Sequence, residues 1–535
     1  MEPLETTNWL LTAIVFAPLV GAAVMFLVPK EEEQTHKLIA LITSLGVLGL
    51  AVGLLADFDY DQAGTLQYFV DAEWINVINS RYLIGVDGMS LPLLALTAFV
   101  MPLVFIYSWN HIPDPGNAKA FLILSLILET GMLGTFVAQD LVLFFVFFEV
   151  VLLPMFFMIA VWGGEDRRYA SLKFFLYTLF GSALMLLSFL ALFFLAGDGD
   201  ARTFSMIELT EMGGSGIART TQLWIFAGMF IGFGVKVPLF PFHTWLPDAH
   251  TQAPTQGSVI LAAVLLKLGT YGFIRVAIPI LPEAAEAWAP WIGLLAVIGI
   301  IYGALCCLAQ TDMKRLIAFS SVAHMGFVML GIATLTDFGI NAAIFGMVAH
   351  GLITGMLFFV AGSVKERYHT LEIKRLGGLL VQAPRMGWIL GFVSMASLGL
   401  PGLAGFWGEF PAILSAYEPA HGLPVETFRT FMVIAAIGTV LAAGYLLWLL
   451  QRTAMGEPRA EFADDPEIVD VRPLEWIAWA PFLVLIVVFG VAPGLIFEVT
   501  DPAVVESLNE CLLDPELYPA GCEGMSAAAE TALGG

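Results

Sequence analysis

The sequence predicts an all-α, polytopic membrane protein of about 14 transmembrane helices. Hydrophobic residues make up 59% of its 535 residues, charged residues make up 13%, and the mean hydropathy is +0.84. Soluble domains carry roughly twice as much charge. Apolar windows long enough to cross about 30 Å of hydrocarbon recur along nearly the whole chain. These spans are predicted to be helices, because an open sheet edge would leave backbone groups unpaired in lipid.

Fourteen apolar runs follow one another from the N-terminus. The first follows the acidic segment "MEPLETTN", which lacks the positive region of a cleaved signal peptide. Long polar breaks are expected at 57–86 and 197–220, and an acidic tail without Lys or Arg follows residue 499. The predicted spans begin near Trp9, Leu38, Leu91, Ala120, Asp140, Ala170, Leu223, Gln256, Trp291, Leu316, Ile340, Gly387, Phe428 and Leu474.

Lys and Arg residues predict the orientation, because cytoplasmic loops of membrane proteins are enriched in them. One set of loops carries Lys30, Lys37, Lys119, Arg167, Arg168, Lys173, Lys314, Arg315, Lys365, Arg367, Lys374, Arg375, Arg385, Arg452, Arg459 and Arg472. The opposite set carries only Arg81, Arg202, Arg219, Arg275 and Arg429. The first set is therefore expected in the cytoplasm, with both termini outside. The net charge of −23 is interpreted as a solvated acidic surface.

Four ionisable residues lie inside the apolar runs. Glu149 lies in "FFVFFEVVLLPMFF", Lys236 lies two residues before Pro238, Lys267 lies in "GSVILAAVLLKLGTYGF", and Glu409 closes "LGLPGLAGFWGEF". A charge at the bilayer centre costs at least about 2.5–3.5 kcal/mol. Such residues face the interior of the helix bundle and mark ion or proton paths. Together they predict proton transport rather than substrate catalysis.

Two of these charges predict an internal repeat. Lys236 in the seventh span and Glu409 in the twelfth each lie beside a predicted helix break, and five spans separate them. Five-helix units related in this way have opposite topology, as in ion-coupled transporters. We therefore divide the chain into helices 1–3 (1–118), a first repeat (119–275), a second inverted repeat (276–450), a last helix (451–498) and a tail (499–535).

Four histidines extend the set of buried titratable groups. His243 and His250 are seven residues apart and would share a face of one helix, while His324 and His350 lie within apolar spans. An imidazole titrates near neutral pH and passes protons through either nitrogen, so the four are predicted to form a proton relay. A single buried histidine is more often structural, and the number of neighbouring charges favours the relay. The other histidines, His36, His111, His369 and His421, are expected at the surface.

Several motifs around these residues resemble one family. The segments "FFEVVLLPMFFMIAVWGGEDRRYASLKFFLYT", "VKVPLFPFHTWLPDAHTQAPTQGSVILAAVLLKLGTYGF", "DMKRLIAFSSVAHMGFV" and "GLPGLAGFWGEF" resemble the antiporter-like subunits of respiratory complex I. The resemblance covers about residues 85–450. Within the family, the position of Glu409 is Lys in sister subunits and Glu in one subunit type, so Glu409 favours that type.

The resemblance implies fourteen helices and roles for the buried residues. It implies that Glu149 pairs with Lys236, that Lys267 lies on a central axis, and that Glu409 ends that axis. It also implies that His243, His250, His324 and His350 lie along this hydrophilic axis.

The resemblance also implies the setting in which the chain works. It implies a translocase subunit that couples NADH:quinone electron transfer to proton pumping in the bacterial inner (plasma) membrane. The chain itself would hold no cofactor or metal, and FMN, iron–sulfur clusters and the quinone site would belong to other subunits. The expected partners are the other membrane subunits, above all the neighbouring antiporter-like ones, and lipids, with no nucleic acid.

Three alternatives use the same sequence features. The chain could be a subunit of a multi-chain cation/proton antiporter, but Glu409 argues against it. It could be the proton-conducting partner of another membrane enzyme, such as a hydrogenase or a bicarbonate-accumulating module, but the agreement over all motifs argues against that. It could be an inert scaffold whose polar residues hold helices together, but four buried charges argue against that.

Two of the four cysteines, Cys511 and Cys522, lie in the tail within "CLLDPELYPAGC". An oxidising compartment permits a disulfide, and the intervening prolines favour turns. A disulfide between these two residues is therefore predicted, with two free thiols as the alternative. No CxxC motif is present, so neither an iron–sulfur cluster nor a zinc site is expected.

Overall fold

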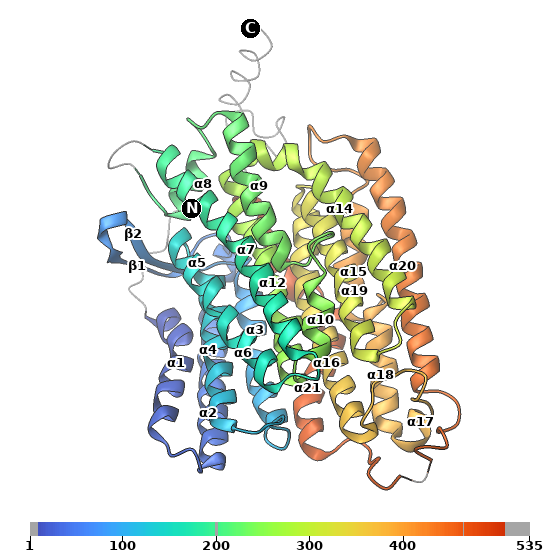
Figure 1. Cartoon of the computed structure of the whole chain (residues 1–535). Helices are drawn as coiled ribbons and strands as arrows, with labels where there is room; N and C mark the ends of the chain where they lie inside the picture. The colour runs from blue at the N-terminus through green and yellow to red at the C-terminus, as the bar shows by residue number, and fades with distance from the viewer. Residues whose placement is uncertain (1–8, 198–201, 464, 509–535) are drawn as a thin grey trace.

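The computed structural model describes residues 9–197, 202–463 and 465–508. Its helices lie side by side in one bundle, and a two-stranded hairpin lies beside α5 (Leu141–Val150) (Figure 1). The predicted all-α membrane fold is confirmed. The predicted disulfide partners Cys511 and Cys522 lie outside the described residues.

The helices follow one another in the order that the apolar runs predict. The first half comprises α1 (Leu10–Leu27), α2 (Glu33–Asp57), α3 (Leu91–Ser108), α4 (Ala118–Val137), α5, α6 (Leu152–Trp162), α7 (Arg167–Leu195), α8 (Met206–Met212), α9 (Arg219–Lys236) and α10 (Trp245–Gln252). The second half comprises α11 (Thr255–Ile260), α12 (Leu266–Gly272), α13 (Ile278–Ile280), α14 (Pro282–Leu308), α15 (Met313–Ala333), α16 (Asp337–Tyr368), α17 (Leu379–Gln382), α18 (Pro384–Ser397), α19 (Ala404–Ser415), α20 (Val425–Thr453), α21 (Pro473–Val491) and α22 (Gly494–Ser507).

Among the described residues, 12 helical segments are long and apolar enough to cross a membrane. The other two predicted spans, which begin near Leu223 and Gly387, contain the broken helices. The first consists of α9 and α10 on either side of a break, and the second consists of α18 and α19. The break divides each of these spans into shorter helices with polar residues between or within them. Helix length and hydropathy therefore do not identify them as membrane spans. The division into two inverted repeats stays a prediction.

The core of the bundle is built by two wholly buried spans, α16 and the segment Thr255–Ile280 that runs from α11 to α13. They pack against each other, and α3, α15, α19 and α21 surround α16. In contrast, fewer than half of the residues of α1, α2, α7, α20 and α21 are buried, as expected of helices that face lipid. Of the charged residues that the sequence singled out, Lys267 lies on one of these two spans, and Glu409 lies on α19, which packs against α16.

A β-hairpin, which the sequence analysis did not predict, fills part of the long break at 57–86. Strands β1 (Gln67–Ile75) and β2 (Ser80–Val86) pair antiparallel, with Val70 opposite Ile84. The Asp140 side chain accepts hydrogen bonds from Ser80 Oγ (3.0 Å) and the Arg81 backbone (3.1 Å) and also caps α5. One buried aspartate thereby fixes the hairpin to the bundle.

The larger set of Lys and Arg residues lies in the connections at one end of the bundle and on the helix ends beside them, and we call this the basic end. These connections are 28–32, 109–117, 163–166, 309–312, 369–378, 454–463 and 465–472. Lys119 donates to the Val28 carbonyl (2.7 Å) and Lys37 to the Trp109 carbonyl (2.8 Å), which links the first two of these loops. The alternation of charge predicted from the sequence therefore corresponds to two distinct ends.

Candidate functional site

The first predicted charges, Glu149 and Lys236, lie close to one another without forming an ion pair. Glu149 ends α5 at the junction with α6, and Lys236 is the last residue of α9. The Lys236 ammonium lies 4.7 Å from the centroid of Phe148, the residue before Glu149. The aromatic face stabilises the cation. Lys236 therefore lies against the residue that precedes Glu149, and no ion pair between the two charges is present among the described residues.

The helix break at Lys236 has a clear local cause. Pro238 has no backbone N–H and cannot continue the helix, so α9 ends at Lys236. The Trp245 indole donates to the freed Val235 carbonyl at 2.9 Å, and Leu239 N donates to the Gly234 carbonyl at 2.9 Å. These bonds satisfy backbone groups that lipid could not satisfy. The break thus holds the lysine at a fixed helix end inside the bundle.

Lys267 lies on α12 between two π-helical turns, Leu261–Leu265 and Phe273–Ala277. The side chain is completely buried, donates to the Ala262 carbonyl and lies 2.8 Å from His350 Nδ1. A π-helical turn shifts the usual bonding of its carbonyls and is frequent at functional sites. Here it presents a carbonyl to the buried ammonium.

The two lysines lie on helices that touch. A Cβ atom on Gly269 would lie 3.0 Å from Lys236 Cβ and 2.7 Å from the Phe233 carbonyl. Only glycine allows α12 to approach α9 this closely. The glycine therefore brings the helix of Lys267 against the stem of Lys236.

His324 on α15 and Glu409 on α19 form the closest pair of the predicted site. Glu409 Oε1 lies 2.5 Å from His324 Nδ1. The other ring nitrogen of His324 lies 3.1 Å from Ser397 Oγ and 3.2 Å from the Tyr445 hydroxyl. Both nitrogens of one imidazole are therefore in hydrogen-bond contact, which fits a group that takes a proton on one side and releases it on the other.

The second helix break positions Glu409. Residues 398–403 separate α18 from α19, and Gly399 and Gly402 adopt positive φ angles of 78° and 93°, which only glycine adopts readily. A Cβ on Gly408 would lie 2.4 Å from Gly346 Cα. This glycine contact brings α19 directly against α16, and Glu409 follows it by one residue.

A small cavity lies between His350, which contacts Lys267, and the pair of His324 and Glu409. It has a volume of about 20 Å³ and is lined by both His324 and His350, together with Glu409 and Thr354. That volume holds roughly one water. The two imidazole rings lie 6.0 Å apart between centroids. Lys267, His350, His324 and Glu409 thus form a continuous row, which we call the axis.

The remaining relay histidines take different positions. His250 on α10 is fully buried and stacks on Phe358 at 4.4 Å, and neither ring nitrogen bonds to a described residue. His243 lies in the break before α10, so the two do not share one helix face as the spacing predicted. Its ring stacks on Phe240 (5.6 Å) and meets the edge of Tyr302 (5.0 Å). The structure brings His243 into no direct contact with the axis.

The structure reveals a buried carboxylate that the sequence analysis missed. Glu129 on α4 has no exposed surface, and its two oxygens accept no hydrogen bond from the described residues. The signal was present, because Glu129 is the one acid in the run "AFLILSLILETGMLG". An unpaired ionisable group within a membrane span is a functional candidate by default.

A second missed feature is the buried ion pair of Arg275 with Asp87. Arg275 was assigned to an outer loop, but it lies within the second π-helical turn, with Nη2 2.5 Å from both Asp87 oxygens. It also donates to the Tyr271 hydroxyl at 3.0 Å. Asp87 in turn accepts from the backbone at the start of α3, namely from Met89 N (3.1 Å) and Ser90 N (3.0 Å). The pair joins α3 to the span of Lys267.

Two of the four histidines expected at the surface are buried. His369 and His421 are exposed as predicted. His36 has no exposed surface, and His111 has only 7% of its side chain exposed, against Glu366. The prediction was wrong for these two because both lie near helix ends where loops fold back over the bundle. Position in a polar segment does not determine burial.

The chemistry that the axis can support is proton transfer. Its titratable groups are two imidazoles, one carboxylate and one ammonium, and neighbours lie within hydrogen-bond distance or across a single water site. Moving a proton along such a row changes the charge that each neighbour experiences.

Comparisons with known proteins find relatives that match nearly the whole chain. A family model described as NADH:quinone oxidoreductase/Mrp antiporter matches residues 138–439, and one described as NADH-ubiquinone oxidoreductase chain 4, amino terminus, matches residues 64–135. The NADH-quinone oxidoreductase subunit M of Rhodobacter capsulatus is 41% identical over 504 residues, covering 92% of this chain and 95% of the relative. A NAD(P)H-quinone oxidoreductase chain 4 of Trichormus variabilis is 38% identical, covering 93% of this chain and 90% of the relative.

Solved structures share the fold. A chain of respiratory complex I from Thermus thermophilus with bound NADH superposes with a TM-score of 0.81 at 28% identity, covering 93% of this chain and 99% of that chain. A chain of the membrane-bound sulfane sulfur reductase, an archaeal respiratory membrane complex, superposes with a TM-score of 0.80 at 20% identity, covering 96% and 100%. The second likeness concerns the fold alone.

Proposed function

We infer that this chain, which belongs to the NADH:quinone oxidoreductase/Mrp antiporter family of membrane subunits, is a proton-translocating subunit of a bacterial NADH-quinone oxidoreductase, of the subunit M type. The observation that carries the inference is the buried axis from Lys267 through His350 and His324 to Glu409. Relatives named subunit M cover nearly the whole chain. The sequence prediction of this family and function is confirmed.

The axis moves protons by handing them between titratable neighbours. The Lys267 ammonium donates towards His350 Nδ1. A proton that leaves His350 crosses the small cavity by way of one water and reaches the His324 side. His324 in turn exchanges a proton with Glu409 at 2.5 Å. Glu409 is the end of the row, and its second oxygen has no partner among the described residues.

Glu149 and Lys236 control when the axis loads. In a medium of low dielectric, opposite charges attract far more strongly than in water. When Glu149 and Lys236 are both charged, they approach one another and Lys236 leaves the face of Phe148. The electric field at the nearby helix of Lys267 then changes. The pair therefore has two states, one with Glu149 and Lys236 apart, as in the structure, and one with the two in contact. Whether Lys267 is protonated depends on which state the pair occupies.

The rest of the proposal concerns the setting of the chain. The basic end faces the cytoplasm, both termini face outwards, and the two five-helix units are inverted repeats. The chain carries no redox centre, while FMN, iron–sulfur clusters and the quinone site belong to partner subunits. Neighbouring antiporter-like subunits are the expected direct partners. The likeness to complex I chains supports this assembly.

The test is to remove either member of the control pair. Glu149→Gln and Lys236→Ala are both expected to assemble but to reduce NADH-driven proton pumping by about tenfold or more, since each 1.4 kcal/mol added to a barrier costs a factor of ten. Glu149→Asp keeps the charge and should retain part of the activity. Pumping is measured as proton uptake into vesicles that contain the purified complex.

The matched control is Glu165→Gln, an exposed carboxylate in the turn after α6, which should pump like the wild type. Unimpaired pumping in both pair variants would reduce Glu149 and Lys236 to structural residues. Sodium-driven proton exchange without NADH, by the wild-type complex, would instead support the antiporter alternative.

A further inference from the structure

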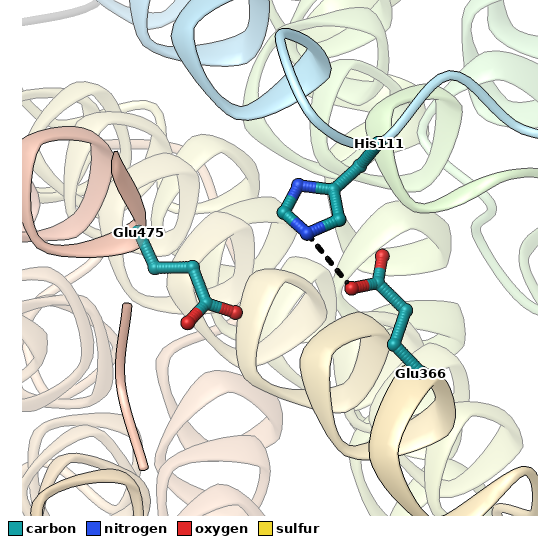
Figure 2. A group of neighbouring side chains, drawn as sticks. All are labelled: His111, Glu366 and Glu475. Carbon is teal, nitrogen blue, oxygen red and sulfur yellow. Dashed lines mark ion pairs between the residues drawn. The ribbon is translucent and has the colours of Figure 1, made fainter. Parts of the chain in front are cut away.

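A second group of titratable residues lies outside the axis, at the basic end of α16. His111, in the connection from α3 to α4, points towards Glu366 on α16, and Glu475 from the start of α21 lies beside them (Figure 2). Three segments far apart in the sequence therefore bring one imidazole and two carboxylates together. The axis does not use any of them.

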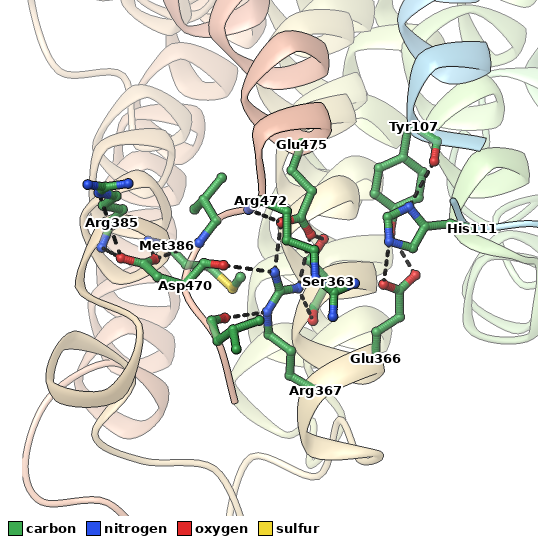
Figure 3. Close-up of polar contacts among 12 residues, drawn as sticks. Tyr107, His111, Ser363, Glu366, Arg367, Arg385, Met386, Asp470, Arg472 and Glu475 are labelled. Atoms are coloured by element: carbon green, nitrogen blue, oxygen red, sulfur yellow. Dashed lines mark hydrogen bonds and ion pairs between the residues drawn. The ribbon is translucent and has the colours of Figure 1, made fainter. Parts of the chain in front are cut away.

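The contacts of His111 show that a proton is held in this group. His111 Nδ1 lies 2.8 Å from the Tyr107 carbonyl, which only accepts, so Nδ1 carries a hydrogen (Figure 3). His111 Nε2 lies 2.9 Å from Glu366 Oε2. A bare nitrogen and a bare carboxylate oxygen would repel each other at this distance. One further proton, on the imidazole or on the carboxyl group, must therefore lie between the two.

The neighbours hold this pair in place from both sides. The His111 ring stacks on the Tyr107 ring at 4.4 Å, with 19° between the planes. The Tyr107 hydroxyl lies 3.1 Å from Glu366 Oε1, so it donates to the second oxygen of the same carboxylate. A single tyrosine thus contacts both members of the pair.

The other charged groups nearby are already paired. Arg367 donates to both oxygens of Glu475, at 2.9 Å and 2.7 Å, and Ser363 Oγ donates to Glu475 Oε1 at 2.7 Å. From α2, Lys37 forms an ion pair with Glu33 at 2.6 Å. Glu366 is therefore left with His111 as its one ionic partner among the described residues.

This pairing decides between a proton and a metal ion. His111, Glu366 and Glu475 offer ligand atoms within 4.8 Å of one another, a spacing that a divalent cation can use. However, the Glu475 oxygens are already occupied, and the Arg367 guanidinium beside them would repel a metal. When His111 is neutral, the charges of Glu366, Glu475 and Arg367 sum to −1. A single added proton neutralises this charge.

The electrostatics favour retention of that proton. Burial alone would lower the pKa of His111, but the hydrogen bond and charge of Glu366, the Tyr107 carbonyl and the charge of Glu475 raise the pKa above the ordinary 6.5. The raised pKa favours the protonated form of the imidazole. Water reaches it through Glu366, whose side chain is 32% exposed, while only 7% of His111 is exposed.

The site lies on the same helix as the axis residue His350, 16 residues nearer the basic end. Phe358 lies eight residues after His350 and eight before Glu366 on the same helix, and eight residues rise about 12 Å. His250, with two unbonded nitrogens, stacks on Phe358. Along the length of α16, titratable groups therefore come in this order from the basic end: first Glu366 with His111, then His250 beside Phe358, and then His350. Gln256 at the start of α11 also donates to the His111 carbonyl at 2.5 Å.

We propose that His111 and Glu366 form a proton-loading site, which takes protons from water at the basic end of the bundle and passes them inwards to His250 and the axis. The proposal rests on the proposed function, because a loading site supplies a proton pump. It adds an entry to the pathway that the axis continues.

The experiment measures NADH-driven pumping by the complex in vesicles as a function of the pH at the basic end, from about 6 to about 9, which brackets the imidazole pKa. Replacing His111→Asn removes the titrating ring. At pH 6, abundant protons should leave the rate close to that of the wild type. At pH 8.5 the rate should fall about fivefold or more, so that the pH profile shifts to lower pH. Glu366→Gln should shift it likewise, and Glu366→Asp should restore part of the rate.

The control is His369→Asn, at the other histidine–glutamate pair of this end. His369 lies 3.3 Å from Glu467, and both side chains are about 70% exposed; asparagine also tolerates the positive φ of 51° at this position. Its pH profile should match that of the wild type. A loss of equal size at every pH, or no loss, in His111→Asn would overturn the loading site. A wild-type complex that fails to pump, or a Lys267 variant that pumps normally, would overturn the proposed function instead.

Discussion

Replacing Lys267 by methionine is expected to abolish proton pumping while the chain still folds and assembles. Methionine keeps the length and most of the volume of lysine but cannot carry a proton. His350 then loses its charged neighbour at 2.8 Å, and the row from His350 to Glu409 loses its donor. A proton without this station would have to cross an apolar gap at a cost of several kcal/mol. The pumping rate should therefore fall by about a hundredfold or more.

The measurement compares the initial rate of NADH-driven proton uptake into vesicles with that of a matched lysine variant. Lys374→Met removes an exposed lysine in the connection after α16 and should pump like the wild type. Intact assembly is checked by copurification of the partner subunits. Pumping by Lys267→Met within twofold of the wild type would show that the axis does not conduct the protons.

Much of the fold was predictable because the bilayer imposes simple rules on the sequence. Every unbroken span was predicted from its apolar run. The break at Lys236 was predicted from Pro238, and the break before Glu409 was predicted from Pro401, Gly402, Gly405 and Gly408. The β-hairpin was missed because its strands, of 9 and 7 residues, are far shorter than a transmembrane run and carry Asp71, Glu73 and Arg81 among their apolar residues. Such a pattern resembles an ordinary polar loop.

The candidate site was predictable where a charge interrupts an apolar run. Lys267, His350, His324 and Glu409 were predicted together, and the structure brings them into one row. The π-helical turns around Lys267 leave no signal in an apolar sequence, so the carbonyl that faces its ammonium was not predictable. Glu129 was predictable by the same rule as Glu149 and was overlooked.

The misassigned residues share one physical reason. His111 and Arg367 lie in polar segments at helix ends, which were predicted to be solvated. Their burial depends on which loops and helix ends fold over one another, and those contacts join residues more than a hundred positions apart. A single sequence carries no local pattern for contacts of that range.

The largest effect on stability is expected from Arg367→Leu. Arg367 is 1% exposed, donates to both oxygens of Glu475, and also donates to the backbone carbonyls of Val469 and Asp470 (Figure 3). These bonds fasten α21 to α16. Removing one member of a buried ion pair leaves the other charge without a partner and costs about 3–5 kcal/mol. The midpoint of thermal unfolding of the purified complex should fall, and less of the chain should be recovered from membranes.

A nearby exposed ion pair supplies the control. Arg385 lies 4.0 Å from Asp470, and 67% of its side chain is exposed. Exposed ion pairs contribute about 0–1 kcal/mol, so Arg385→Leu should unfold close to the wild-type temperature. A shift as large as that of Arg367→Leu would show that charge at this end, rather than the buried pair, determines stability.

The double variant Arg367→Leu, Glu475→Leu separates the cost of an unpaired charge from the loss of the fastening bonds. With both charges removed, no ion is left buried without a partner, and apolar replacement of a buried pair is often neutral or stabilising. The double variant should therefore recover most of the stability that Arg367→Leu loses. Recovery would also leave Glu366 and His111 in place, because neither bonds to Arg367 or Glu475. A double variant as unstable as the single one would instead assign the fastening to the Val469 and Asp470 carbonyls.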